Sequence, residues 1–271
     1  MVYKRGMSLS RFAGGLIGTL FILTFGAAIY SGWNLYSIYQ SEFPDVAALK
    51  DRFPQVVYSK SDGETQVQFS RSKPESWVDL ADVSKVAVGA IIVSEDWAFY
   101  SHKGYDPNQI KEALLEDLER KKFAFGASTI TQQVVKNVFL YKEKSLWRKL
   151  REVYLAVKIE ERVGKTKILE TYLNIVELGE GIYGIKNASR LYFNKEPRDL
   201  SAKEGAFLAM LLPSPKKYSQ SFRSRELSHY AKTTIDRILA KMIRANYLTE
   251  DEKESEARRP LSFESPSDTS L

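Results

Sequence analysis

The chain opens with a long uncharged segment and then changes to a series of amphipathic segments. Residues 12–41 contain no charged side chain, and the apolar first part of this stretch is long enough for a helix of about 20 residues that crosses a bilayer. Three basic residues precede it, and such charges favour the cytoplasmic side. The pattern predicts a cytoplasmic N-terminus over residues 1–11, a transmembrane helix over residues 12–36, and a body on the outer side. The alternative is a cleaved signal peptide, whose apolar region is usually shorter.

After a connector, apolar residues recur at helical spacing. The connector, residues 37–76, contains an alternating stretch and a turn at Ser61-Asp62-Gly63, which predict a small hairpin. From Asp79 onward the apolar residues are spaced by three and four, as on one face of a helix. Further helices are expected over Pro107–Arg120, Ser128–Asn137, Ser145–Val163, Thr166–Val176, Gly184–Phe193, Ser201–Leu212 and Ser228–Ala245. The body, residues 77–245, is therefore predicted to be mainly α-helical, and the charged, Ser- and Pro-rich residues 246–271 are predicted to form a disordered tail.

The composition excludes some kinds of site. The 271 residues include no cysteine and only two histidines, His102 and His229, which are far apart in the sequence. A disulfide or a thiolate metal site is therefore excluded, and no metal site is predicted. Residues 121–167 contain twelve Lys or Arg and four acidic residues, a local net charge of +8. A concentrated basic stretch indicates an anionic partner, which is a phosphate, an acidic membrane or a nucleic acid.

Glu95 is the first candidate for chemistry. It ends an apolar helical segment, and the aromatic residues Trp97, Phe99 and Tyr100 follow closely. A carboxylate against aromatic surface loses hydration, which raises its pKa and makes it a useful proton acceptor near neutral pH. We interpret Glu95 as a general base. The alternative is an ordinary carboxylate at the surface end of a helix.

Residues 126–137 combine small hydroxyl residues, two adjacent glutamines and a lysine. Ser128 and Gln133 have groups that hold sugar hydroxyls or phosphate oxygens, and Lys136 provides a point charge for an anionic leaving group. This combination indicates that the segment lines a groove that binds a saccharide and its phosphate. The alternative is a capped helix with a polar face.

Residues 144–162 form the third stretch of interest. An apolar stripe predicts that this helix is mostly buried; it comprises Leu146, Leu150, Val153 and Val157. Arg148 and Glu152 are four residues apart and are drawn toward the interior or a cleft. One interpretation is a simple ion pair across one helical turn. The other is that Glu152 is a second functional carboxylate, held by cations beside Glu95. A fourth stretch, residues 167–195, is interpreted as structural core that supports the cleft.

Taken in order, these stretches resemble the signature of the peptidoglycan glycosyltransferases, which occur as monofunctional enzymes and as the N-terminal halves of class A penicillin-binding proteins. The segments that carry the resemblance are EDWAFYSHKGYD at 95–106, GASTITQQVVKN at 126–137, RKLRE at 148–152, KILETYLN at 167–174 and LLPSPKKY at 211–218. The likeness covers about residues 77–245. It implies a mainly α, lysozyme-like glycosyltransferase domain of two lobes with a groove between them.

The resemblance also implies roles for single residues. Glu95 takes the position of the catalytic base and Glu152 that of the second glutamate. The positions implied for the donor's pyrophosphate are Ser128, Gln133, Lys136, Lys144 and Arg148. Lys144 stands where many relatives carry arginine, and a lysine keeps the charge without the bidentate fork.

The reaction implied is an inverting glycosyl transfer that polymerises lipid II. Glu95 removes a proton from the C4 hydroxyl of the acceptor N-acetylglucosamine, and that oxygen attacks the anomeric carbon of the growing chain while undecaprenyl diphosphate leaves. No cofactor is required, although a divalent cation such as Mg or Mn assists some family members. The implied partners are lipid II, the growing lipid-linked glycan, the bacterial cytoplasmic (inner) membrane and other cell-wall synthesis proteins. Nucleic acid is not expected, because the basic segment faces outward.

Three other functions compete with this interpretation. A lysozyme-like lytic transglycosylase also uses a glutamate near a sugar, but it needs no cationic leaving-group site such as Lys136. An inactive wall-binding scaffold need not keep both glutamates and both main cations. A second, transpeptidase activity is not expected at this length, because the S-x-x-K matches at Ser70 and Ser214 are followed by neither S-x-N nor K-T-G.

Overall fold

A computed structural model describes residues 9–58, 65–108, 111, 128–140 and 145–264; within these ranges the side chains of residues 9–21, 38, 41 and 58 are not described. The chain divides into two compact units, residues 1–45 and residues 46–271. The helix expected over Pro107–Arg120 falls mostly outside the described residues.

In the first unit the structure describes one helix, α1 (Leu9–Glu42). Near its end, the Trp33 and Tyr36 rings are 6.3 Å apart, and the Tyr39 ring is 5.4 Å from that of Phe43, which follows the helix. The helical part of the prediction for residues 12–36 is confirmed. Among the residues that the structure describes, no helix combines the length and the apolar character needed to cross a membrane.

The second unit begins with the predicted hairpin. A short helix, η1 (Val46–Lys50), precedes strands β1 (Phe53–Tyr58) and β2 (Thr65–Ser70). The strands are antiparallel, with Phe53 opposite Ser70 and Tyr58 opposite Thr65. Lys167 of α6 (Lys165–Ile175) holds the hairpin, since its ammonium lies 4.8 Å from the ring centre of Phe53.

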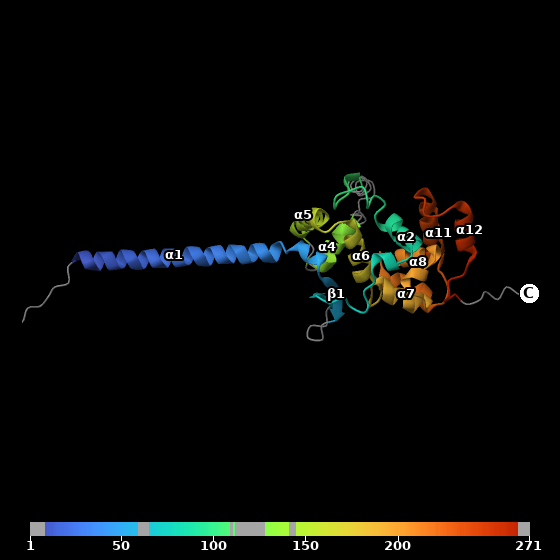
Figure 1. The fold of residues 1–271 in the computed structure, drawn as a ribbon, viewed down its shortest axis with the longest axis horizontal. Helices are drawn as coiled ribbons and strands as arrows, with labels where there is room; N and C mark the ends of the chain where they lie inside the picture. Colours follow the sequence, from blue (N-terminus) through green and yellow to red (C-terminus); the bar gives the residue numbers. More distant parts are fainter. Residues whose placement is uncertain (1–8, 59–64, 109–110, 112–127, 141–144, 265–271) are drawn as a thin grey trace, which may run out of the picture. The chain divides into compact units, whose positions relative to one another are not determined.

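Three helices form the centre of the second unit (Figure 1): α2 (Lys85–Glu95), α8 (Ala202–Leu211) and α11 (His229–Arg244). Every residue of α8 is buried. A Cβ atom on Gly205 would lie only 2.5 Å from the Cα of Ala87, so glycine is required where α8 crosses α2. Because α2 ends at Glu95, this contact positions the candidate base.

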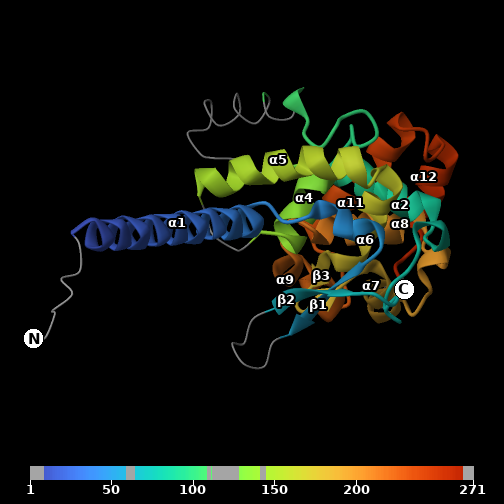
Figure 2. The same ribbon diagram turned by 60° about the vertical axis from the view of Figure 1, so that its left-hand side comes forward.

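A second group of helices is visible in Figure 2: α4 (Ile130–Val138), α5 (Leu146–Arg162) and α6, with α4 packed against the other two. Thr129 and Gln132 form a reciprocal capping box at the start of α4, which satisfies two backbone donors that the helix leaves open. The predicted ends of these helices differ from the observed ends by one or two residues.

The other described elements of the second unit are η2 (Leu80–Asp82), β3 (Glu177–Gly179), β4 (Ile182–Tyr183), α7 (Ile185–Phe193), η3 (Pro197–Asp199), α9 (Pro215–Tyr218), α10 (Gln220–Arg223) and α12 (Glu250–Arg258). Strands β3 and β4 pair antiparallel. The prediction of a mainly α-helical body is confirmed.

The expectation that α5 is mostly buried is wrong for its first half. Leu146 is 87% exposed and Leu150 is 64% exposed, whereas Leu155 and Ile159 are buried. An apolar stripe has the same spacing whether it faces a protein core or another nonaqueous surface, so periodicity alone could not distinguish the two.

The prediction of a disordered tail is wrong for residues 250–258. Thr249 caps α12 through a second capping box with Glu252. Leu248 and Leu261, on either side of α12, are buried. The buried Lys203 side chain donates to the carbonyl oxygens of Ala257 and Arg259. A capped helix and two apolar anchors therefore order this segment in spite of its polar composition. The last part of the predicted tail, residues 265–271, lies outside the described residues.

Candidate active site

Glu95 is held by a glutamine on the neighbouring helix α4. The Gln133 amide nitrogen donates to Glu95 Oε2 at 2.9 Å. Burial raises the pKa of the Glu95 carboxyl above its usual value, and the Gln133 hydrogen bond and the charges of Lys136 and Lys241 oppose that rise. The raised pKa is the property that a general base near neutral pH requires.

The other end of the same amide contacts a tyrosine. The Tyr172 hydroxyl donates to Gln133 Oε1 at 3.4 Å, so the amide nitrogen is turned toward Glu95. Burial, together with the charges of Glu95 and Asp96, holds the pKa of Tyr172 well above its usual range, which keeps its proton in place. The segment that contains Tyr172 was predicted to be structural core that supports the cleft, and its sequence contains no sign of this link to Glu95.

Asp96, the next residue, ties the end of α2 to the start of α4. It is fully buried and accepts a hydrogen bond from the Ile130 backbone N–H at 2.8 Å. His102 Nε2 lies 2.9 Å from Asp96 Oδ1, while His102 Nδ1 accepts from the Gly104 N–H at 3.1 Å. The ring proton therefore lies on Nε2, which donates to Asp96. This network fixes the helix that carries Gln133 relative to Glu95.

A second cluster surrounds Glu152 on α5. Glu152 is 1% exposed and accepts from Arg148 Nη1 at 2.8 Å. The Lys149 ammonium also donates to Glu152 and, at 2.8 Å, to Ser128 Oγ. Ser128, Arg148, Lys149 and Glu152 are therefore linked in one cluster, and the Arg148–Glu152 contact is the ion pair across one helical turn that the spacing offered as one alternative. Lys149 was missed, although its position three residues before Glu152 indicates the same helix face.

Two cations of the site have unused capacity for an anion. Arg148 Nε is buried and has no hydrogen-bond partner among the described residues, which is costly unless an acceptor completes the site. Lys136 is exposed near the end of α4, and its charge acts on Glu95. Lys144 lies outside the described residues.

The described acidic groups do not suit a divalent cation. Within the described ranges, no group of three or more His, Asp or Glu side chains is arranged to hold a metal ion. Glu152 is already paired with two cations, and Glu95 accepts from an amide. We therefore derive no chemical step through a metal.

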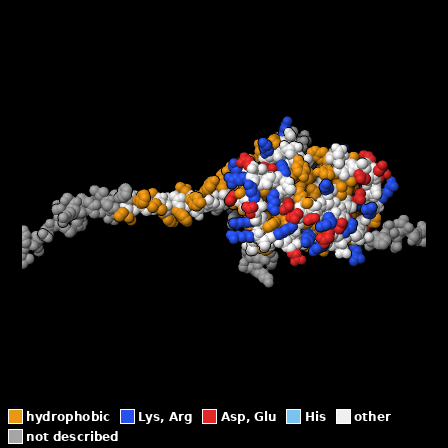
Figure 3. Space-filling model, in the orientation of Figure 1, with side chains coloured by type: hydrophobic (Ala, Val, Ile, Leu, Met, Phe, Trp, Pro, Cys, Tyr) orange, Lys and Arg blue, Asp and Glu red, His pale blue; other side chains and the backbone are white. Residues whose placement is uncertain are grey.

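The surface of the second unit has a basic edge and an apolar area on one face (Figure 3). In Figure 3, Lys and Arg side chains gather at one edge of this unit, and apolar side chains form an area across the middle of the same face. A surface of this kind suits a partner that is both anionic and apolar.

On a mainly α-helical scaffold, a buried carboxylate of raised pKa and a separate cluster of cations form an arrangement that can serve a transferase, because such a carboxylate can accept a proton and such cations can bind an anionic leaving group. Residues 62–243, more than half of the chain, match the model of the family described as Transglycosylase. The chain belongs to this transglycosylase family.

Individual relatives agree with the family match. A protein of Nitrosomonas eutropha named biosynthetic peptidoglycan transglycosylase is 34% identical over 232 residues, which cover 83% of this chain and 92% of the relative. The protein of the same name from Nitrosomonas europaea is 35% identical over 84% of this chain and 91% of its own length. Penicillin-binding protein 1A of Vibrio cholerae is 33% identical over 91% of this chain, but the match spans only 29% of that protein. These findings favour the biosynthetic enzyme over the lytic enzyme and the inactive scaffold.

Proposed function

We propose that this chain is a peptidoglycan glycosyltransferase that polymerises lipid II by inverting transfer and releases undecaprenyl diphosphate. The observation that carries the proposal is the Gln133 amide, which donates to Glu95 from within the segment that matches the family. It holds a carboxylate of raised pKa, the group that the first step needs.

In the first step, Glu95 accepts the proton of the acceptor's C4 hydroxyl. The oxygen then forms a bond to the anomeric carbon of the donor while the bond from that carbon to the pyrophosphate breaks on the opposite face. Gln133 orients the carboxylate throughout. Because the Glu95 pKa is raised, the base is stronger than an ordinary exposed glutamate.

The second cluster supports the departure of the pyrophosphate. Arg148 donates from Nη1 to Glu152, and its buried Nε has no partner in the part of the chain that the structure describes; we assign this Nε to a phosphate oxygen. Lys136 adds a mobile point charge. Glu152 acts as a positioning residue, because it holds Arg148 and Lys149 and leaves their remaining donors for the leaving group.

We further propose that the enzyme is anchored in the bacterial cytoplasmic membrane with its catalytic unit outside. Residues 12–41 carry no charge, and a 34-residue helix covers this segment. The exposed apolar side chains of α5, which are Leu146, Trp147, Leu150 and Tyr154, supply a second contact with lipid. We also propose that the catalytic unit has the lysozyme-like division into two lobes. Other cell-wall synthesis proteins are its proposed protein partners.

The direct test is incubation of the detergent-solubilised protein with lipid II, followed by separation of polymer from substrate. We expect polymer from the wild type and a loss of about 10²- to 10⁴-fold in Glu95→Gln, because an amide cannot accept the proton. A Glu95→Gln rate within about threefold of wild type would contradict the assigned base, since a lost general base has a much larger effect.

A further inference from the structure

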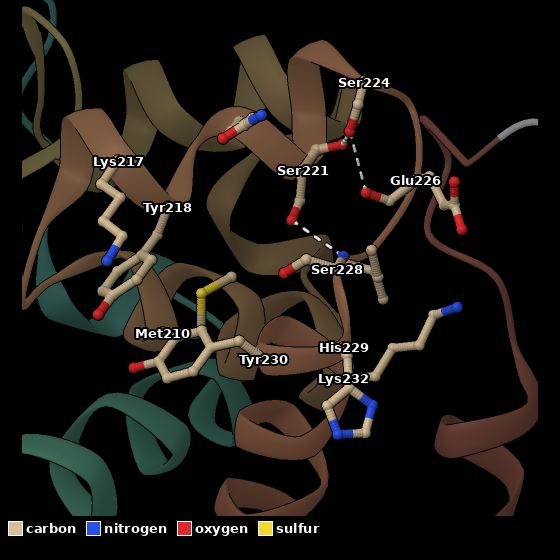
Figure 4. Close-up of a pocket in the computed structure, with 12 residues that line it drawn as sticks. Met210, Lys217, Tyr218, Ser221, Ser224, Glu226, Ser228, His229, Tyr230 and Lys232 are labelled. Atoms are coloured by element: carbon tan, nitrogen blue, oxygen red, sulfur yellow. Dashed lines mark hydrogen bonds between the residues drawn. The ribbon is translucent and has the colours of Figure 1, made fainter.

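A cavity lies apart from the catalytic clusters. Its volume is about 700 Å³, and it is lined by the last turn of α8, by α9 and α10, and by the first turn of α11 (Figure 4). Neither Glu95 nor Glu152 lines it. Its size falls in the range of about 300–1,000 Å³ that is usual for ligand sites.

One side of this cavity is a stack of aromatic rings. Tyr218 and Tyr230 stack with ring centres 4.7 Å apart and an interplanar angle of 20°, beside Met210 in Figure 4. The Lys217 ammonium lies 5.5 Å from the centre of the Tyr218 ring. Tyr230 is 46% exposed, so part of a flat ring held by its neighbour is accessible. Such a ring offers a rigid apolar surface with a polar edge, which suits the mixed surface of a sugar.

Two hydroxyl groups at the opposite side can donate into the cavity. Ser221 Oγ accepts from the Ser228 backbone N–H at 3.4 Å, and Ser228 Oγ accepts from the Ala231 N–H at 3.2 Å. A hydroxyl that accepts such a bond keeps its own proton as a donor. These groups can therefore bind sugar hydroxyl or carbonyl oxygens.

The charges along the cavity favour an acidic ligand. Lys217 and Lys232 line it, and Glu226 is the single acidic residue in the lining. Within the described part of the chain, neither lysine has a carboxylate partner. Carboxylates of a ligand would supply the missing charge.

We propose that this cavity binds the growing glycan strand at a distance from the reaction, with a sugar ring on Tyr230 and the carboxylates of the peptide stem on Lys217 and Lys232. The inference rests on the proposed function, since it assigns the product of that reaction as the ligand. Its role is to retain the strand between successive additions.

Helix α11 connects this cavity with the catalytic cluster. Lys241, near the end of α11, approaches the Val93 carbonyl on the helix that carries Glu95, at 3.5 Å. Tyr230 lies at the other end of α11, about 16 Å away along the axis at 1.5 Å per residue. The cavity and the contact with the helix that carries Glu95 are therefore separated along α11 by about the length of a few sugars.

Binding can be tested without catalysis in the full-length Glu95→Gln protein in detergent. The probe is a lipid-free tetrasaccharide of alternating N-acetylglucosamine and N-acetylmuramic acid with its peptide stems, measured by calorimetry. A photoreactive form, mapped by mass spectrometry, should label residues 217–232. We expect Tyr230→Ser and the pair Lys217→Met with Lys232→Met each to weaken binding by about tenfold, the loss of one good contact.

Two control variants distinguish loss of the Tyr230 ring or of the lysine charges from a nonspecific effect of substitution on the fold. Tyr230→Phe keeps the ring and should bind within about threefold of the parent, and Lys85→Met, an exposed lysine at the start of α2, should have no effect. Unchanged affinity in Tyr230→Ser, or labelling confined to the catalytic clusters, would overturn the proposal. Equal affinity for the same tetrasaccharide without its stems would overturn the assignment of the lysines.

Activity supplies an independent readout in the otherwise wild-type protein. Tyr230→Ser should form the first glycosidic bond between two lipid II molecules at the wild-type rate but should release shorter strands, because only an elongated product reaches the cavity. Strands of wild-type length would contradict the proposal. If the wild type formed no polymer, the proposed function would fail, while the binding result in Glu95→Gln would still show whether the cavity binds glycan.

Discussion

Tyr172 and Glu95 contact opposite ends of one side-chain amide. The Tyr172 hydroxyl donates to Gln133 Oε1, and Gln133 Nε2 donates to Glu95 Oε2. The ionised Glu95 carboxylate can only accept a hydrogen bond, so it requires the amide nitrogen, and the Tyr172 hydroxyl then donates to the amide oxygen. A buried tyrosine thus supports, from the far end of the amide, the hydrogen bond received by the base.

Replacing Tyr172 with Phe should change the pH dependence of polymerisation. The ring and its packing remain, but the Gln133 amide oxygen loses the donor that holds it in place, and the hydrogen bond from Gln133 to Glu95 becomes weaker. Since that hydrogen bond lowers the Glu95 pKa, the pKa should rise and the acidic limb of kcat/KM should move to higher pH, by less than about one unit for one hydrogen bond. Tyr183→Phe, on strand β4, is the control. An acidic limb unchanged from wild type would show that Tyr172 only packs.

Glu95→Gln should stabilise the fold at neutral pH while it abolishes activity. Burial raises the Glu95 pKa above its usual value of 4.5, so the charged form is less stable in the folded chain than in the unfolded chain. That unfavourable contribution is present when both states are ionised and disappears below pH 4.5, where both are protonated. Calorimetry should therefore show a higher Tm for the variant at pH 8 and equal values at the lowest accessible pH.

Glu161→Gln is the matched control for that measurement. Lys158 holds the pKa of the exposed Glu161 carboxyl below its usual value, which is the opposite direction. Its contribution is present at neutral pH and is lost as the pH falls, so removing it should leave Tm unchanged or lower it. A rise in Tm in both variants would mean that the loss of any negative charge stabilises this basic chain, and that the environment of Glu95 is not the cause.

Lys136→Ala and Glu152→Gln should reduce turnover by different routes and in a non-additive way. Lys136 should meet negative charge as it develops on the leaving group, so its loss should reduce mainly kcat. Loss of the Glu152 charge loosens Arg148 and Lys149, which should also weaken donor binding. Kinetics of both single variants and the double variant measure the coupling. Strictly additive losses would contradict a shared pyrophosphate site.

The exposed half of α5 should matter for lipid-embedded substrate and not for folding. Leu146→Glu with Leu150→Glu should leave Tm near the wild-type value, because both side chains are exposed. Polymerisation in vesicles should fall, whereas turnover of a short-chain, water-soluble substrate analogue should not. Leu191→Glu, an exposed leucine of α7, should affect neither. An equal decrease with both substrates would place the α5 effect in the catalytic site instead.

The membrane topology can be examined with a reporter fused after Leu271. The absence of charge over residues 12–41 and the basic residues before them predict that the fusion is active when the reporter requires an extracytoplasmic location. A reporter that folds only in the cytoplasm should be inactive. Activity of the cytoplasmic reporter alone would overturn the proposed topology and, with it, access to lipid II on the outer face.

Local signals explain most of the fold that could be predicted. Helices α4, α5, α8 and α11 each begin after a Ser or Thr whose side chain caps the first turn, and their apolar spacing is regular. The same local argument failed for α12, where the polar composition hid a capping box and the anchors Leu248 and Leu261. The argument from apolar spacing also failed for the first half of α5, because spacing does not show whether an apolar face packs against the protein core or lies exposed.

The candidate site was predictable where a motif or a helical spacing marks it. Arg148 and Glu152 are four residues apart and do pair. The contacts of Gln133 with Glu95 and with Tyr172 join residues 38 and 39 positions apart, and no local pattern indicates which distant side chains meet. Lys149 was missed for a different reason. Arg148 had already been paired with Glu152, so no second cation was sought for this carboxylate.

The close contact of α8 with α2 at Gly205 makes the enzyme sensitive to a change at a residue that takes no part in the chemistry. One added methyl group at that position would meet the Ala87 backbone and would force α2 and α8 apart. Glu95, at the end of α2, would then shift relative to Gln133, which belongs to a different helix. Gly205→Ala would therefore resemble a catalytic mutation in an assay, and an inhibitor that wedges these helices apart would silence the enzyme without competing with its substrate.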